Sequence, residues 1–382
     1  KELKIFFSVD ALEQAISLAD RYIYGKALPA KAMDLLTEIG YKIREQRGSN
    51  SFIEGNDVIE LVAQKTKVPL GDIEETEKDK LLNLEDLIHE RVINQEEAVK
   101  GIADAMRRSR LELETRKKPI ANFLFVGPTG VGKTETAKTL AQAYFNNEKK
   151  MIRLDMSEYQ EKRSLQRLIG SRTEEATNKG YLTEAVKRQP YSLILLDEIE
   201  KAHPDILNLF LQVMDDGRLT DISGETINFT NTIIIATSNA GTHFIQKKIA
   251  KKISYQEIEK ELKQEVLLEY FNPEFLNRFD KIVLFKALTM DNMNKIARLF
   301  LKSFKDKLEQ KGILFEVEED AIEELAQKGY DPLYGARPLK RVIQDNVENQ
   351  TANLFLEDKL KRRDKLILKK GLELEIEKAK EF

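Results

Sequence analysis

Short apolar runs alternate with longer stretches of helical periodicity in the middle of the chain. The runs have the length of buried strands, and the stretches between them place apolar residues three or four positions apart. Because parallel strands buried on both faces are apolar throughout and are joined by helices, this alternation predicts an α/β domain whose parallel sheet is covered on both faces. The five predicted strands lie at residues 123–126, 151–154, 193–196, 233–236 and 282–285.

The beginning of the chain has a different pattern. A strand is predicted at residues 3–9, and residues 10–65 are predicted to be mainly helical. A charged helical connector follows at residues 76–93. The first helix is expected to bury one apolar stripe, formed by Leu12, Ala15, Ile16 and Ala19.

The end of the chain returns to helical periodicity from about residue 287, and a hairpin around Gly371 is predicted near its end. The pattern therefore predicts a helical start, an α/β middle and a small helical end. With 382 residues the chain is long enough for two or three domains.

Composition narrows the class of protein. The chain is 41% hydrophobic and 33% charged, which is typical of a globular protein, and its net charge is only −3. Such a balance offers no overall field to attract nucleic acid or an anionic membrane, so neither is expected as a partner. The absence of Cys excludes disulfides, thiolate zinc sites and Cys nucleophiles.

No apolar run approaches the length needed to cross a bilayer, and no signal peptide opens the chain. We therefore expect a cytoplasmic protein, with an organelle matrix as the alternative. Because the first residue is Lys1 rather than Met, we also expect a fragment of a longer protein.

The strongest chemical motif is a phosphate loop that follows the first predicted strand and precedes a helix, which is the setting that the motif requires. Its glycines let backbone N–H groups point at a phosphate, and the helix N-terminus adds positive potential. In this motif Lys133 bridges the β- and γ-phosphates and Thr134 ligates Mg²⁺, so ATP and Mg²⁺ are the expected cofactors. The loop consists of Gly127, Pro128, Thr129, Gly130, Val131, Gly132, Lys133 and Thr134.

A second motif is the apolar strand that ends in Asp197 and Glu198. A carboxylate pair at a strand end can simply mark the point where a chain reaches solvent. Downstream of a phosphate loop, however, Asp197 is expected to hold magnesium through water and Glu198 to polarise the attacking water. The presence of Glu198 predicts hydrolysis as well as binding.

Three further polar residues lie where they could meet a nucleotide. Asn239 follows a predicted strand and could hydrogen-bond the γ-phosphate or the attacking water, or could simply end the strand. Arg278 could reach a nucleotide held by a neighbouring subunit, and the alternative is a surface Arg paired with Asp280. Arg337 precedes Pro338 in the predicted first turn of a helix. The helix dipole does not favour a cation at this end, so an anionic ligand would explain the presence of Arg337.

Together these motifs resemble the second AAA+ module of the Clp unfoldases, the ClpA, ClpB and ClpC group. The resemblance also includes residues 197–205, 216–221 and 335–337, and it spans nearly the whole chain. It implies a P-loop AAA+ fold with a parallel five-stranded sheet flanked by helices and with helical subdomains before and after it. It further implies Mg-ATP hydrolysis in a ring, most simply a hexamer, that remodels unfolded or aggregated proteins.

The resemblance also implies a division of the chain. Residues 1–75 resemble the small helical subdomain of a first module, residues 76–286 the large nucleotide-binding domain with its helical lead-in, and residues 287–382 the C-terminal small subdomain. Val92 and Ile93 resemble the segment that lies near the adenine.

Three departures from the family bear on substrate handling. The expected pore loop, residues 170–180, lacks the aromatic residue of the family, so we expect poor unfolding of folded substrates. The tripeptide that docks a ClpP-type peptidase is absent from residues 241–272, which leaves such a partner unsupported. Only a short stretch at residues 47–56 occupies the place of the long insertion of ClpB.

Three alternative functions remain open. The chain could be the ATPase regulatory subunit of a Clp protease, a nucleic-acid motor on the same fold, or a scaffold that binds nucleotide without hydrolysis. A nucleic-acid motor would need a basic pore loop, whereas Arg172 and Lys179 are balanced there by Glu174 and Glu175. A scaffold would not need Glu198.

Overall fold

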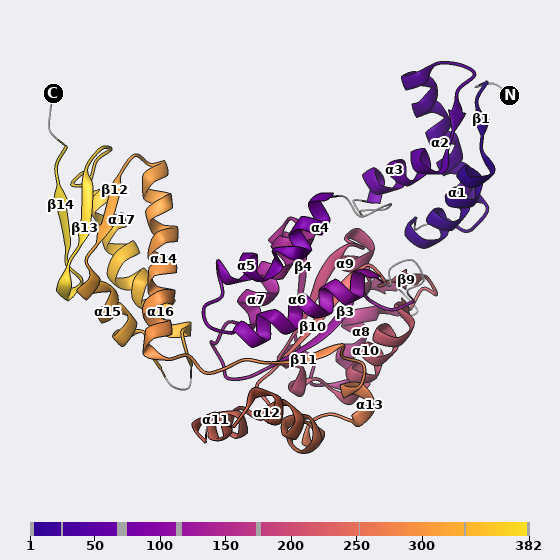
Figure 1. Cartoon of the computed structure of the whole chain (residues 1–382). Coiled ribbons are helices and arrows are strands. Elements are labelled where there is room, and N and C mark those ends of the chain that lie inside the picture. The colour runs from indigo at the N-terminus through magenta and orange to yellow at the C-terminus, as the bar shows by residue number, and fades with distance from the viewer. Residues whose placement is uncertain are drawn as a thin grey trace.

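The computed structural model describes residues 4–23, 26–66, 75–111, 117–172, 177–251, 253–331 and 334–379. Its central element is one sheet of five parallel strands in the order β11-β3-β10-β7-β4 (Figure 1). This confirms the predicted α/β class and the number of strands. The strands are β3 (Ala121–Val126), β4 (Met151–Asp155), β7 (Ser192–Asp197), β10 (Thr232–Ser238) and β11 (Lys281–Leu284).

Both faces of this sheet are buried, because successive side chains of a strand point to opposite sides. Phe123 and Phe125 of β3 join the apolar cluster that includes α6 (Glu96–Leu111) and α7 (Lys133–Phe145). Leu124 and Val126 join a second cluster. That cluster includes residues of α8 (Leu165–Ile169), α9 (Tyr181–Arg188) and α10 (Pro204–Asp216).

The first part of the chain holds α1 (Val9–Tyr22), α2 (Ala30–Arg47) and α3 (Gly55–Thr66), with the two-residue strands β1 (Phe6–Phe7) and β2 (Phe52–Ile53) paired in parallel. The predicted strand is thus much shorter than residues 3–9. Two residues of the predicted stripe, Leu12 and Ile16, are exposed, and the buried face of α1 consists of Ala11, Ala15 and Ala19 instead. Small side chains on that face let α1 and α3 approach closely.

Short helices connect this part to the sheet, namely α4 (Glu75–Leu82) and α5 (Leu84–His89). Two antiparallel pairs extend from the domain. They are β5 (Gly170–Arg172) with β6 (Thr177–Lys179), and β8 (Arg218–Thr220) with β9 (Thr226–Asn228). Between the last two strands of the sheet lie α11 (Thr242–Ala250), α12 (Tyr255–Glu261) and α13 (Pro273–Leu276).

The C-terminal part contains a sheet as well as helices, which corrects the expectation of a helical end. Strand β12 (Leu314–Val317) pairs in parallel with β13 (Lys365–Leu368), which pairs antiparallel with β14 (Leu374–Glu377). The last two strands are the predicted hairpin. The helices are α14 (Met290–Gln310), α15 (Glu319–Lys328), α16 (Arg337–Ile343) and α17 (Asn349–Leu356). Within the described residues, no helix has the length and apolarity that a bilayer crossing requires.

Candidate active site

The phosphate loop connects the buried strand β3 to the first residue of α7, as the motif predicts. Lys133 begins α7 directly after Gly132, which has a left-handed φ of 110°. The loop therefore ends at a helix N-terminus, where free N–H groups favour an anion.

Lys133 is buried and held by oxygen atoms within its own chain. Its Nζ donates hydrogen bonds to the carbonyl of Gly127, to the carbonyl of Pro128 at 2.9 Å and to Asn239 Oδ1 at 2.8 Å. Burial lowers the pKa of Lys133 to about 8, against the opposing charges of nearby carboxylates. These contacts place the ammonium group over the loop, where a phosphate bound by the loop would meet it.

Asp197 ends β7 and is positioned by two side chains. Thr237 Oγ1 donates a 2.5 Å hydrogen bond to Asp197 Oδ1, and Arg153 Nη2 lies 2.6 Å from Asp197 Oδ2. The charge of Asp197 also raises the pKa of Lys133, so this carboxylate acts electrostatically on the lysine of the loop. A carboxylate here and the hydroxyl of Thr134 next to Lys133 are the oxygen donors that Mg²⁺ prefers, so the residues present fit this metal.

Glu198 follows with a left-handed backbone, at φ 57° and ψ 52°. Its N–H donates to Thr237 Oγ1 at 3.1 Å, so Thr237 links the two neighbouring carboxylate residues. Lys201 Nζ donates a 2.5 Å hydrogen bond to Glu198 Oε2, and Glu198 raises the pKa of Lys201. This carboxylate is the group predicted to polarise the attacking water, and in the isolated chain it is held by Lys201.

Asn239 connects the end of β10 to the loop. Its Oδ1 accepts from Lys133 and, at 3.4 Å, from Thr129 Oγ1. Its backbone N–H donates to Glu200 Oε1 at 2.9 Å, while Glu200 Oε2 is buried and no partner is found for it among the described residues. Glu200 is also the strongest of the charges that raise the pKa of Lys133.

Glu200 was missed by the sequence analysis, although it stands two positions after Glu198 in the same motif. A third carboxylate so close to the predicted pair was the available signal. Its effect on Lys133 depends on the packing of the turn that follows β7, and the sequence does not show that packing.

Arg278 lies apart from this cluster within the chain. Its Nε donates to Asp215 Oδ2 at 2.6 Å, and its Nη2 lies 3.7 Å from Glu274 Oε1. The alternative pairing with Asp280 is wrong, because the partners of Arg278 are Asp215 and Glu274, and Asp280 accepts the backbone N–H of Asn122 near the beginning of strand β3. No contact recorded for the described residues joins Arg278 to the phosphate loop of its own chain.

The segment before α16 packs directly on the phosphate loop. The N–H of Ala336 donates to the carbonyl of Gly130 at 3.1 Å. A Cβ atom on Gly130 would lie 2.0 Å from the carbonyl oxygen of Tyr334, and one on Gly335 would lie 2.8 Å from that of Gly130. Only glycine allows the two backbones to approach this closely.

Arg337 begins α16 as predicted, with Pro338 in the first turn. Its side chain is exposed, and its charge lowers the pKa of Lys133. The structure thus brings Arg337 electrostatically near the loop, while Arg278 remains distant from it. The role of Arg337 in binding an anion stays a prediction.

Val92 and Ile93 precede α6. Val92 is buried, Ile93 is partly exposed, and Val92 Cγ1 would lie 3.8 Å from a Cβ atom on Gly132. The segment expected near the adenine therefore borders the phosphate loop.

A buried amide next to it, Gln95, was not singled out from the sequence. Its Nε2 donates to the carbonyls of Lys286 and Val131 at 2.9 and 3.4 Å, and its Oε1 accepts the N–H of Lys286 at 2.8 Å. Gln95 therefore ties the phosphate loop to the connection between β11 and α14. A Gln in a polar segment carries no sign of burial in the sequence, so only the structure could show this role.

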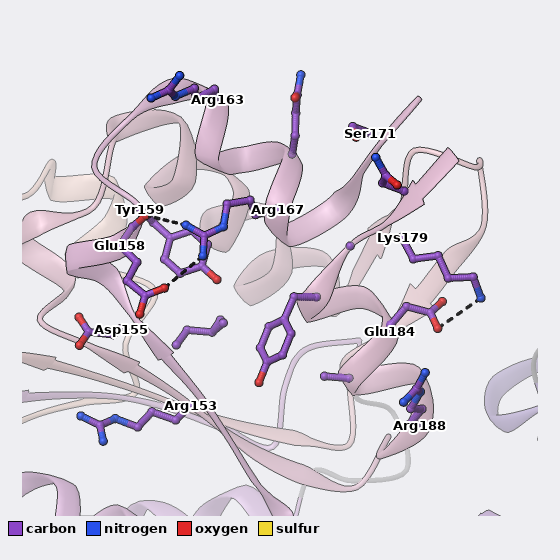
Figure 2. A pocket seen from close by; sticks show the side chains of 16 residues that line it. Arg153, Asp155, Glu158, Tyr159, Arg163, Arg167, Ser171, Lys179, Glu184 and Arg188 are labelled. Atoms are coloured by element: carbon purple, nitrogen blue, oxygen red, sulfur yellow. Dashed lines mark hydrogen bonds and ion pairs between the residues drawn. The ribbon is translucent and has the colours of Figure 1, made fainter. Parts of the chain in front are cut away.

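A cavity of about 1080 Å³ lies away from the phosphate loop, beside the hairpin β5–β6 (Figure 2). This hairpin belongs to the expected pore loop, whose residues 173–176 lie outside the described residues. Tyr181, the aromatic residue that follows the hairpin, is 54% exposed and lines the cavity.

Comparison with known proteins gives three family matches along the chain. An AAA lid domain matches residues 2–100, an AAA domain (Cdc48 subfamily) matches residues 118–282, and the C-terminal, D2-small domain of ClpB protein matches residues 288–368. The chaperone protein ClpB of Vibrio vulnificus is 48% identical over 85% of this chain. The chain belongs to the Clp family of AAA+ proteins.

Two other relatives extend this family comparison. The ATP-dependent Clp protease ATP-binding subunit ClpE of Bacillus subtilis is 41% identical over 93% of this chain. A closed-state structure of Hsp104 with ATPγS and FITC casein matches this chain with a TM-score of 0.83 and 35% sequence identity. The match covers 98% of this chain and 65% of the Hsp104 chain. The fold is therefore that of a Clp-family AAA+ protein. The chain spans 38% of the Vibrio ClpB and 58% of the Bacillus ClpE.

Proposed function

We propose that this chain is the ATP-hydrolysing part of a Clp-type unfoldase or disaggregase, which works as a ring to remodel unfolded or aggregated proteins. The observation that carries the proposal is the convergence of Lys133, Asn239 and the Asp197–Glu198 pair at the carboxyl ends of neighbouring strands. The names of the relatives, which include chaperone proteins and a structure with casein, support a protein substrate.

The residues divide the work of ATP hydrolysis. The loop N–H groups and Lys133 bind the phosphates, and Thr134 and Asp197 hold Mg²⁺, which neutralises developing charge when it is bound. Glu198 accepts a proton from the attacking water, and Asn239 orients that water or the γ-phosphate. Arg337 contacts the bound anion from the small subdomain.

Arg278 acts on a nucleotide held by the neighbouring chain. It must first leave Asp215, which occupies its Nε in the isolated chain. Head-to-tail contacts of this kind close into a ring, and we propose a hexamer in keeping with the family resemblance. The cytoplasm, or an organelle matrix, stays the predicted location.

One observation favours the second candidate, a regulatory subunit of a Clp protease. The ClpE relative that carries such a name matches more of this chain than the Vibrio ClpB does. The docking tripeptide is nevertheless absent from residues 241–272, so we rank the chaperone function first.

The test is ATP turnover with and without an unfolded protein, together with a mass measurement with and without nucleotide. We expect turnover that the unfolded protein stimulates and a mass that rises when ATP is present. Lys133→Ala should abolish nucleotide binding, since it removes the buried charge that faces the phosphates. The matched control is Lys138→Ala, which removes a partly exposed Lys from the same helix. Turnover that responds to nucleic acid but not to protein would contradict the proposal.

A further inference from the structure

The cavity beside the hairpin β5–β6 has an unusual lining for a pocket that the ATP chemistry does not use. Five cationic side chains and three carboxylates surround it, so the lining carries a net positive charge in a chain that is slightly negative overall. A positively charged concave surface attracts anionic ligands. The five cations are Arg153, Arg163, Arg167, Lys179 and Arg188.

Lys179 and Arg167 are accessible, and their ion-pair partners are themselves at least partly exposed. The Lys179 Nζ lies 3.4 Å from Glu184 Oε2, and the Lys179 side chain is 73% exposed. Arg167 lies 5.0 Å from the centre of the Tyr159 ring and pairs with Glu158 at 3.1 Å. Figure 2 marks the contact between Arg167 and Glu158 with a dashed line. Exposed ion pairs contribute little and exchange readily, so the carboxylates of a ligand can replace these partners.

The remainder of the lining favours a polypeptide as the ligand. Tyr181 offers an exposed aromatic ring at the start of α9, which suits apolar side chains as well as backbone. The carboxylates of Asp155, Glu158 and Glu184 would repel a continuous polyanion such as nucleic acid. A peptide with spaced acidic groups can avoid them.

We propose that this cavity binds an acidic segment of polypeptide, whose carboxylates pair with the cationic side chains while its apolar groups lie against Tyr181. The proposal rests on the proposed function and gives its substrate a chemical class. It also assigns a binding role to a region whose hairpin lacks the aromatic residue that the family resemblance led us to expect.

Arg153 connects this cavity to the ATP site. It lines the cavity with a side chain that is 51% exposed, and its Nη2 lies 2.6 Å from Oδ2 of the much less exposed Asp197. A peptide carboxylate in the cavity competes with Asp197 for the same guanidinium group. Peptide binding therefore changes the charge environment of Asp197 and with it the affinity for a nucleotide that engages Asp197. By linkage, that nucleotide must change the affinity for the peptide by the same factor.

The test is the fluorescence anisotropy of a labelled Glu-rich peptide mixed with the full chain in the absence of nucleotide. We expect binding that weakens as salt is added. A Lys-rich peptide and an uncharged Ser-Gly peptide of equal length should bind more weakly. Tighter binding of a single-stranded oligonucleotide of similar length, or equal binding of the uncharged peptide, would overturn the proposal.

Variants locate the site. Arg163→Ala and Arg188→Ala should each weaken peptide binding by about two- to fivefold, which is the scale of an exposed charge contact. The matched control is Arg341→Ala, whose side chain is 86% exposed on the C-terminal subdomain and which should leave peptide affinity unchanged. Parental affinity in the double variant Arg163→Ala/Arg188→Ala would place the peptide elsewhere and contradict the proposal.

Arg153 tests the link to the ATP site. In the parent, adding ATP should shift the peptide affinity, whereas in Arg153→Gln the shift should disappear. Arg153→Lys, which keeps the charge, should restore part of it. An unchanged shift in Arg153→Gln would contradict the link. Peptide binding without ATP turnover would sink the proposed function and leave this inference intact, so the two failures are distinguishable.

Discussion

Lys133 and Arg278 are both proposed to act on bound nucleotide, Lys133 in its own chain and Arg278 in a neighbouring chain, and their surroundings in the structure differ. Lys133 is buried and surrounded by oxygen acceptors of its own chain, two of them backbone carbonyls. Arg278 is partly exposed and paired with the side chain of Asp215. One cation therefore lies against the phosphate loop of its own chain, while the other pairs with a side chain away from the loop.

This difference indicates how the work is shared between chains. The oxygen partners of Lys133 all belong to its own chain, so we expect phosphate binding to need a single chain. The Arg278 ion pair is partly exposed, so we expect Arg278 to exchange Asp215 for a partner on another molecule. Binding is therefore expected to survive in isolation, and hydrolysis is expected to require assembly.

The sharpest test of this comparison is Arg278→Ala. We expect nucleotide affinity within a few-fold of the parent and a turnover reduced by about 10³ or more, because transition-state charge is no longer stabilised. ATP turnover and calorimetry measure the two quantities. Arg298→Ala, which removes a partly exposed Arg paired with Glu319, is the control.

Mixing two inactive variants tests the shared site without relying on the turnover of a single variant. Chains with Lys133→Ala and chains with Arg278→Ala should regain some activity together, because some interfaces then pair an intact loop with an intact Arg278. If the two variants assemble by mass measurement and show no regained hydrolysis, the two cations do not serve a shared site.

Glu198→Gln is expected to have the next largest effect. It should keep ATP binding and reduce turnover by about 10² to 10⁴, because an amide cannot take a proton from water. If Lys133 acts within its own chain and Arg278 across chains, Glu198 is expected to act in the same chain as Lys133. Glu357→Gln, an exposed carboxylate paired with Lys359, should leave turnover unchanged. Parental turnover in Glu198→Gln would show that the base is another residue.

The buried position of Lys133 predicts a pH dependence that Arg278 does not share. Burial lowers the pKa of Lys133 to about 8, so the free chain loses this charge as pH rises through that value. ATP affinity should fall above pH 8, by up to about tenfold per pH unit. Calorimetric titrations across that range measure it. Lys133→Arg, which stays charged, should remove the dependence. A flat profile in the parent would show that the ammonium remains charged.

The smallest expected effect comes from freeing Arg278. Asp215→Asn removes the carboxylate partner of Arg278 Nε. Arg278 then loses no ion pair with Asp215 when it binds to a neighbouring chain. We expect half-maximal turnover at a chain concentration about two- to fivefold lower. Glu274→Gln, which removes the more distant partner, should have a smaller effect. A higher concentration requirement in Asp215→Asn would mean that the ion pair supports assembly.

The features that were predicted correctly are formed by residues that are consecutive in the sequence. The phosphate loop and the strand that ends in Asp197 are continuous segments, and they occur where predicted. Gln95 and Glu200 act through contacts that only the packed fold creates. Their importance could not be inferred from local pattern.

The errors have a similar origin. Leu12 and Ile16 were assigned to the core because they are large and apolar, but the close contact of two helices selected the smaller Ala residues. Strand β12 was missed because it has only four residues, and the charged Glu316 interrupts its apolar positions.

The close contact of Gly130 with the segment before α16 also constrains the order of events during synthesis. The N–H of Ala336 is the donor to the Gly130 carbonyl, so that bond can form only after translation has passed the start of α16. A nascent chain that already contains the whole phosphate loop therefore lacks one of the contacts that hold it. We therefore expect full nucleotide affinity only after the small subdomain has emerged from the ribosome and docked on the loop.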